Sequence, residues 1–238
     1  MNTQLTRVLQ ILLLLILPLQ AERTIRIVYL GAPADSSLKE LFIYGTSGEN
    51  PSVAVQSKLN HSNFSPQIPI DEQASTLRLL AEPLGEDQSF PEGTTTVAID
   101  KKWQHTLLIL FHRKTSKTTL PVRIHKINAS PNKFKPGELH WINLSEVALG
   151  GRVGDQKIVL KPKETRVMKC PAGEIECTVK LNYLVKGEKK SRSLIRQMWR
   201  VGKKTRQVVL ILKRPPPKYA TYYVLPFRDP PKPAAPKQ

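Results

Sequence analysis

The sequence has few cysteines, few aromatic residues and no long apolar run beyond its N-terminus. Only 2 of the 238 residues are cysteine, and Phe, Trp and Tyr together make up 6%. Two cysteines exclude a disulfide-rich scaffold. No segment after the N-terminus approaches the roughly twenty apolar residues of a membrane-spanning helix. Hydrophobic residues still amount to 40%, which is enough for a packed core.

Motifs of catalysis and metal binding are also missing. The chain contains no G-x-S-x-G, and Gly150–Asp155 lacks the Lys-Ser/Thr ending of a phosphate loop, so we interpret that segment as a glycine-rich hairpin or bulge. No two histidines have the i, i+2 or i, i+4 spacing that places metal ligands on one face of a strand or helix. We therefore expect no catalytic residues, metal or cofactor. A hydrolase remains an alternative only if residues that are far apart in the sequence form its active site in the folded chain.

The N-terminus has the pattern of a secretory signal peptide. Met1–Arg7 carries one positive charge, Val8–Leu19 is apolar apart from Gln10, and Ala21 supplies a small residue for cleavage. The apolar stretch is too short to span a bilayer. Cleavage after Ala21 predicts an exported protein, placed in the periplasm, the cell envelope or outside the cell.

Short strands separated by turns dominate the rest of the chain. Ile25, Ile27 and Tyr29 alternate with their neighbours, whereas Leu107–Phe111 and Val208–Leu212 are continuous apolar runs typical of strands covered on both faces. Further strands are predicted at Glu40–Tyr44, Thr76–Leu80, Thr95–Ile99, Val122–Ile127, Glu138–Leu144, Lys157–Leu160, Thr165–Met168, Glu176–Val185 and Ser193–Val201. This spacing predicts an all-β fold, an antiparallel β-sandwich built as one large or two tandem immunoglobulin-like sandwiches.

The domain organisation follows from a faint internal similarity and from the C-terminal prolines. Arg26–Pro33 resembles Arg123–Pro131, which would fit two sandwiches, although chance explains the match nearly as well. We expect a signal peptide (1–21), a first sandwich half or domain (22–118), a basic second one (119–227) and a disordered proline-rich tail (228–238). The apolar segment Tyr219–Phe227 is predicted to dock as an edge strand.

The two cysteines, Cys170 and Cys177, bracket a turn-like stretch. Residues that flank a hairpin loop face each other across the strands, which suits a disulfide in an oxidising compartment. Two free thiols or half of a metal site are the alternatives, and the spacing matches no common zinc pattern.

Positive charge is concentrated in the last 88 residues. Residues 151–238 carry 22 Lys and Arg against 6 Asp and Glu, a net of +16 out of the total +18. Strand geometry places Arg196 and Arg200 on one face, with Lys203, Lys204 and Arg206 near the following turn. These five residues are the predicted anion-binding site. Outside the cytoplasm, anionic lipid or acidic polysaccharide would be its partner, and a face that only aids solubility is the alternative.

The chain resembles a group of uncharacterised exported bacterial proteins with all-β folds. The resemblance is carried by Arg26–Pro33, Leu59–Pro66, Thr76–Leu80, Trp141–Ser145, Gly151–Gly154, Trp199 and Pro226–Asp229. It implies a β fold and export from a bacterial cell, and it implies no activity, because these proteins have no assigned function.

Three hypotheses about function follow. The first is a non-enzymatic protein that associates with the anionic cell envelope through its basic C-terminal surface. The second is a scaffold or assembly subunit that binds a protein partner by adding a strand at a sheet edge, with Tyr219–Phe227 as the segment involved. The third is the hydrolase mentioned above. Sequence-specific nucleic-acid binding is not expected, since no reading motif is present, and the sequence leaves the oligomeric state open.

Overall fold

A computed structural model describes residues 22–31, 33, 36, 38–46, 54–85, 88–113, 117–169, 176–185, 187–188, 190–214 and 222–229. This part of the chain contains sixteen strands and no helix, so the predicted all-β class is confirmed. The signal peptide, residues 230–238 and Cys170 lie outside the described residues.

The first eight strands form two four-stranded sheets that face each other. They are β1 (Thr24–Leu30), β2 (Glu40–Thr46), β3 (Val55–Lys58), β4 (Ile68–Pro69), β5 (Thr76–Leu80), β6 (Thr95–Ala98), β7 (His105–His112) and β8 (Val122–Asn128). Sheet A has the order β4-β1-β7-β8, and sheet B has the order β3-β2-β5-β6. Between them lies a core that includes Ile27, Leu41, Leu79 and Leu108.

The next eight strands repeat this arrangement. They are β9 (Glu138–Asn143), β10 (Ala148–Val153), β11 (Gln156–Leu160), β12 (Thr165–Lys169), β13 (Glu176–Leu184), β14 (Arg192–Arg200), β15 (Arg206–Lys213) and β16 (Tyr222–Asp229). Sheet C has the order β12-β9-β15-β16 and sheet D the order β11-β10-β13-β14, which are the orders of sheets A and B shifted by eight strands. Most pairs are antiparallel, but β1–β7 and β9–β15 are parallel. Two sandwiches of one topology therefore follow each other in the chain.

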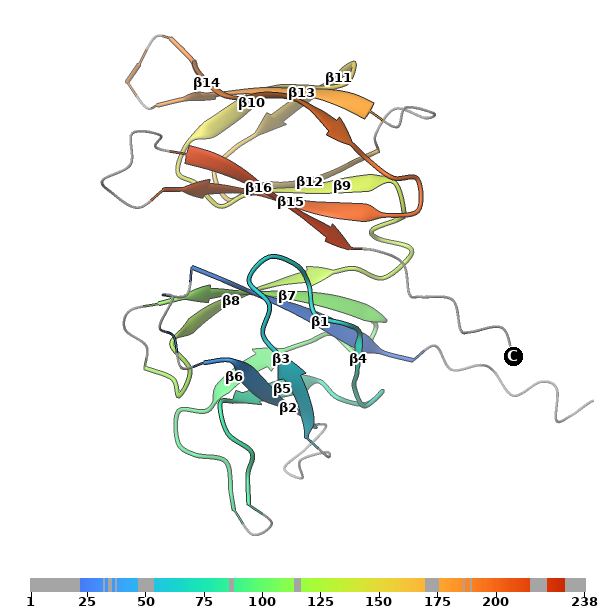
Figure 1. The fold of residues 1–238 in the computed structure, drawn as a ribbon, viewed down its shortest axis with the longest axis vertical. Coiled ribbons are helices and arrows are strands. Elements are labelled where there is room, and N and C mark those ends of the chain that lie inside the picture. The colour runs from blue at the N-terminus through green and yellow to red at the C-terminus, as the bar shows by residue number, and fades with distance from the viewer. Residues whose placement is uncertain are drawn as a thin grey trace, which may run out of the picture.

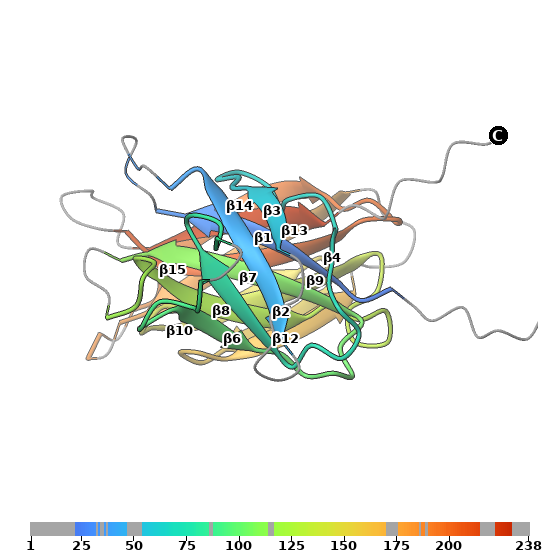
Figure 2. The ribbon, with the colours of Figure 1, turned by 90° about the horizontal axis from the view of Figure 1, so that it is seen from below.

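The two sandwiches stack into four layers in the order B, A, C, D (Figure 1). Figure 2 views the stack from below, with sheet B nearest the reader. A third apolar core lies between sheets A and C and includes Val28, Ile109, Phe134, Val208 and Leu210. Because sheets A and C are covered on both faces, their central strands β7 and β15 are buried along most of their length. This confirms the interpretation of the two continuous apolar runs.

The division between the sandwiches lies later in the chain than residue 118, where we expected it. Strand β8, at Val122–Asn128, pairs with β7 along its whole length and so completes sheet A of the first sandwich. The second sandwich begins with β9 at Glu138. The similarity between Arg26–Pro33 and Arg123–Pro131 therefore compares β1 with β8, which hold different places in the sheet. The repeat is one of topology, with β1 equivalent to β9.

The described part of the C-terminal apolar segment, from Tyr222 to Phe227, forms the edge strand of sheet C, as predicted. Strand β16 pairs residue by residue with β15, from Tyr222 opposite Lys213 to Asp229 opposite Arg206. The strand continues past Phe227 through Arg228 and Asp229, two residues that we had assigned to the disordered tail. Asp229 is buried, and it holds the end of the strand in place through the ion cluster described next.

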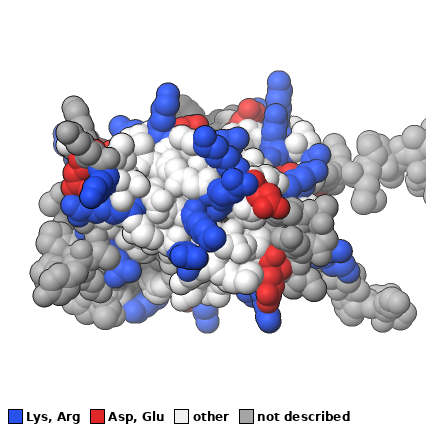
Figure 3. Space-filling view, turned by 90° about the horizontal axis from the view of Figure 1, so that it is seen from above, with Lys and Arg blue, Asp and Glu red and all other residues white. Residues whose placement is uncertain are grey.

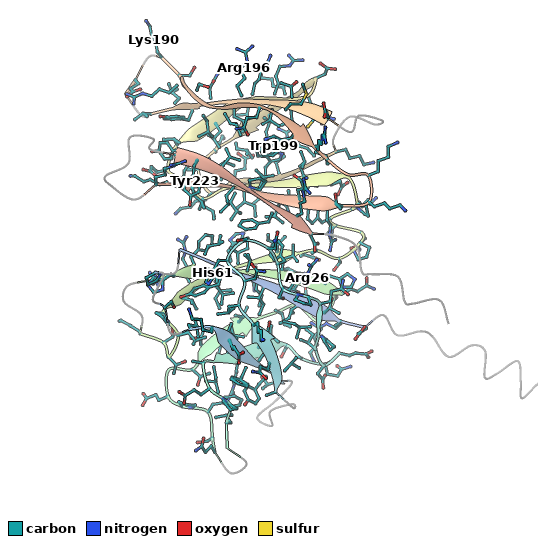
Figure 4. The ribbon with its side chains drawn as sticks, viewed as in Figure 1. Arg26, His61, Lys190, Arg196, Trp199 and Tyr223 are labelled. Atoms are coloured by element: carbon teal, nitrogen blue, oxygen red, sulfur yellow. The ribbon has the colours of Figure 1, made fainter. Side chains whose placement is uncertain are left out.

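A buried ion cluster joins the two sandwiches. The carboxylate of Asp229 accepts hydrogen bonds from Arg26 Nη1 of β1 and from Arg206 Nε of β15, the latter at 2.5 Å. The side chains of Arg26, Arg206 and Asp229 are only 12%, 15% and 1% exposed. Arg206 Nη1 also donates to the carbonyls of Ala129 and Phe134, at 2.5 and 2.7 Å. Arg26 is labelled at the contact between the sandwiches in Figure 4.

Candidate anion-binding face

The outer face of sheet D carries several of the positive charges of the second sandwich. Along its strands the side chains alternate, so that Leu149, Ile158 and Val179 enter the core while their neighbours point to solvent. Figure 3 looks onto this end of the molecule and shows Lys and Arg side chains crossing the middle of the face, with few acidic side chains beside them.

Four of these cations stand in one row across the four strands. In the strand register, Lys157 of β11 lies opposite Arg152 of β10, Arg152 opposite Lys180 of β13, and Lys180 opposite Arg196 of β14. All four are exposed. Neighbouring strands lie about 4.8 Å apart, so the row is about 14 Å long. We call these four residues the cation row.

The cation row is unfavourable for the fold by itself. Like charges directly opposite each other in neighbouring strands destabilise a sheet. Among the described residues no carboxylate forms an ion pair with any member of the row. Other cations of this sandwich do have such partners: Arg200 pairs with Glu176, and Lys213 with Glu146. The row is therefore a line of positive charge that can attract an external anion.

The nearest outward-facing residues beside the row on β10, β13 and β14 are neutral, while Asp155 and Glu176 line a hollow next to Arg152 and Lys180. Gly150 and Asn182 lie one step away on one side, and Thr178 and Met198 lie one step away on the other. A side chain added at Gly150 would meet nothing within 4 Å, so the surface there is open. Met198 is 65% exposed, the most exposed large apolar residue in the described chain. The row is thus accessible from above along its length.

The corresponding face of the first sandwich is covered by its own chain. On the outer face of sheet B, Tyr44 lies opposite Arg78. Phe90, from the segment after β5, packs edge-on against Tyr44 with 5.3 Å between ring centroids, and the Arg78 guanidinium lies 4.2 Å from the Phe90 ring centroid. The Leu84 amide donates to the Tyr44 hydroxyl at 2.8 Å. Of the two equivalent faces, the one that carries the row is the open one.

The structure separates the five predicted anion-binding residues. Arg196 belongs to the cation row, and it points away from the stack (Figure 4). Arg200 is on the same face but is paired with Glu176. Lys203 and Lys204 are exposed in the turn after β14. Arg206 was placed wrongly on this surface, because its guanidinium is buried against Asp229 and two carbonyls at the contact between the sandwiches.

Sequence reasoning missed three of the four row residues, Arg152, Lys157 and Lys180. Gly150–Asp155 does lie in a hairpin, formed by β10 and β11, as we interpreted it, but only the register of sheet D shows that Arg152 stands beside Lys157 and Lys180. Gly151 lies within β10, and a Cβ there would come within 2.0 Å of the Lys180 carbonyl oxygen, so glycine permits the close approach of β10 to β13. The turn itself is Gly154-Asp155, with Gly154 at a positive φ of 56°. The sequence Gly154-Asp155, flanked by residues that alternate between apolar and polar, is typical of a two-residue hairpin turn and could have located the two strands.

A hollow opens beside the row at the edge of the second sandwich. It is lined by Glu176, Met198, Trp199, Arg200, Gln207, Pro226 and Arg228. Trp199 is partly buried, and its ring stacks on the buried Trp141 with 5.6 Å between centroids and 8° between planes. Figure 4 shows Trp199 between sheets C and D, below the level of the outer face.

Cys177 is buried in the core of the second sandwich. Its predicted disulfide partner, Cys170, lies outside the described residues, so the Cys170–Cys177 pairing stays a prediction. Among the described residues no group of three or more His, Cys, Asp and Glu is arranged to hold a metal ion, and no helix there is long and apolar enough to cross a membrane.

The histidines make contacts within the fold. The Tyr29 hydroxyl lies 2.9 Å from His112 Nδ1, the Thr24 hydroxyl lies 2.7 Å from His105 Nδ1, and His140 packs edge-on against Phe134 between sheets A and C. Burial lowers the pKa of His140 to about 4, and the nearby His125 adds to this lowering.

Acidification should destabilise the contact between the sandwiches through His140. Because its pKa is lower in the folded chain, the neutral ring contributes stability that is complete above pH 6.5 and is lost as the pH falls towards 4. A shift of this size corresponds to about 3 kcal/mol. Urea denaturation between pH 4 and 7 should show a weaker pH dependence for His140→Gln than for the wild type. The exposed His61→Gln is the matched control, and parallel curves for wild type and His140→Gln would contradict the assignment.

Comparisons with known proteins give little further information. No protein-family model matches the chain, and no curated protein matches it. A solved structure described as "Alpha-glucan recognition by family 41 carbohydrate-binding modules from streptococcal virulence factors" is similar over 79% of this chain and 93% of that one, with 13% identity and a TM-score of 0.26. Similarity at this level supports no conclusion about function, so the case for function depends on the face of sheet D.

Proposed function

We propose that this is an exported, non-enzymatic binding protein that associates with anionic components of the cell envelope through the cation row. The observation that carries the proposal is the row itself, in which four exposed cations from four strands stand in direct register without an ion-pair partner among the described residues. A cationic surface attracts polyanions with an affinity that falls as salt screens the charges. Export is supported by the sequence pattern of residues 1–21.

The open surface of sheet D also supports binding. A face that served only solubility would gain from charges of both signs interspersed over it. Here the cations are aligned, and Met198, Val159 and Leu184 are exposed on the same face at 65%, 46% and 44%. Cations aligned in one row are unlike the interspersed charges of a face that serves only solubility.

Charge reversal within the row is the direct test. The double variant Arg152→Glu/Lys180→Glu should bind anionic envelope fragments or vesicles at least about tenfold more weakly at low salt, since each cation near an anionic surface contributes about 1 kcal/mol. The measurement is co-sedimentation at 50 and 500 mM salt. Lys101→Glu/Lys102→Glu is the matched control, because it makes the same change of charge at exposed positions of the first sandwich.

The same variant separates loss of binding from loss of folding. A glutamate at 180 would face Arg196 and a glutamate at 152 would face Lys157, so two like-charge pairs become opposite-charge pairs worth about 0.2–1 kcal/mol each. The two glutamates also face each other, which replaces the like-charge pair of Arg152 and Lys180 by another. The variant should thus be at least as stable as the wild type while binding more weakly. Equal binding by the row variant and the control, or binding that salt leaves unchanged, would refute the proposal.

A further inference from the structure

The shape of the site restricts which anion it fits. The row is one residue wide and about 14 Å long, and the residues directly beside it on β10, β13 and β14 are neutral. A flat bilayer would contact the whole outer face and would bind to scattered cations as well as to aligned ones. A single line of charge running across the strands matches a chain whose charges are themselves arranged in a line.

A hollow at the sandwich edge can be reached from the end of the row along strand β14. Strand β14 carries Arg196 in the row, then Met198, then Arg200 on the outer face. Met198 and Arg200 also line the hollow, together with Trp199 and Arg228. A ligand that leaves the row at Arg196 therefore reaches the hollow along β14 without crossing an acidic surface other than Glu176, which Arg200 neutralises.

The residues of the hollow favour a ligand with rings and hydrogen-bonding groups. Trp199 supplies a flat ring whose orientation is fixed by stacking on Trp141. Because this ring is already held rigidly, it loses little conformational entropy when a ring of the ligand stacks on it. Arg228 is exposed and supplies a planar donor suited to a carboxylate. Because Trp199 lies between sheets C and D (Figure 4), a bilayer resting on the outer face would not reach it.

We propose, resting on the function proposed above, that the ligand is a linear acidic polysaccharide. The chain lies across the strands on the cation row, with its carboxylates on Lys157, Arg152, Lys180 and Arg196. It then follows β14 into the hollow, where a sugar ring stacks on Trp199 and a further carboxylate meets Arg228.

The test uses the full chain with defined probes. Polygalacturonate is the acidic polysaccharide, dextran the neutral one, polyadenylate a polyanion without sugar carboxylates, and phosphatidylglycerol/phosphatidylcholine vesicles the bilayer. Polygalacturonate should bind and quench tryptophan emission, whereas dextran should not bind. Lys180→Glu should weaken this binding about tenfold. Trp199→Phe should weaken it severalfold and remove the quenching, and Lys101→Glu should leave it unchanged.

The outcomes distinguish this inference from the proposed function. Vesicle binding that depends on the row, with no polygalacturonate binding, would overturn the inference of a polysaccharide ligand but would leave the proposed function standing. Binding to neither probe would overturn both. Equally tight binding of polyadenylate would overturn the preference for acidic sugars. If Trp199→Phe fails to fold, the exposed Arg228→Glu tests the hollow instead, and unchanged polygalacturonate binding by that variant would overturn the path through it.

Discussion

Replacing Asp229 with alanine should lower the free energy of unfolding by about 3–5 kcal/mol, because it leaves two buried guanidinium groups without their counter-ion. The Asp229 side chain is 1% exposed and accepts hydrogen bonds from both Arg26 and Arg206. Without it, Arg26 keeps the Ser65 carbonyl at 2.7 Å, and Arg206 keeps its two carbonyl acceptors. Neutral acceptors do not balance the desolvation of two charges. Urea denaturation followed by tryptophan fluorescence measures the loss.

A surface ion pair supplies the control for this prediction. Glu176→Ala removes the partner of Arg200, in a pair whose side chains are 76% and 44% exposed, so its cost should stay below about 1 kcal/mol. Replacing the whole cluster by apolar residues, as Arg26→Met/Arg206→Met/Asp229→Leu, should restore most of the stability that Asp229→Ala loses. If Asp229→Ala unfolds at the same urea concentration as Glu176→Ala, the cluster does not hold the sandwiches together.

The outcome for Arg206 shows what a charge count leaves out. In the sequence, Arg196 and Arg206 belong to the same basic segment and look alike. The partners that bury Arg206 are 23 residues away at Asp229 and 77 and 72 residues away at Ala129 and Phe134, so only the fold reveals them. Among the residues that the structure describes, Arg196 has no such partners, and it stays on the surface. Net charge therefore shows which part of the chain is basic but not which of its side chains stay exposed.

The strands were predictable where composition alone decides the structure. The runs Leu107–Phe111 and Val208–Leu212 are apolar at every position, and both became central strands buried on two faces. Which strands lie side by side was not predictable, because the parallel pairs β1–β7 and β9–β15 join segments far apart in the chain. The cation row depends on that pairing. Its four members come from four strands and form a line only once the register of sheet D is known.

Replacing Arg23 with alanine should cost about 3–5 kcal/mol of stability, the second large effect that we expect. The Arg23 side chain, at the start of β1, is buried and donates to five carbonyls: Trp103, Asp71, Glu72, Ala74 and Asp100, at 2.7 to 3.2 Å. These carbonyls belong to the turns before β5 and before β7, so one guanidinium fastens two turns to the first strand. Several of the carbonyls are partly accessible and would bind water in the variant. The loss of stability should therefore be smaller than the cost of leaving five buried carbonyls without a hydrogen bond.

The guanidinium fork, rather than the positive charge, should be what matters at this position. An ammonium group has three donors at one point and cannot serve five acceptors spread around a planar fork, so Arg23→Lys should recover less than half of the loss. Lys102→Ala, an exposed change in one of the two turns, should stay within about 0.5 kcal/mol of the wild type in the same urea titration. Wild-type stability for Arg23→Lys would mean that charge alone suffices. If Arg23→Ala matched Lys102→Ala, the two turns would be held by their own hydrogen bonds, such as those from the Ala74 amide to the Asp71 carbonyl and from the Trp103 amide to the Asp100 carbonyl.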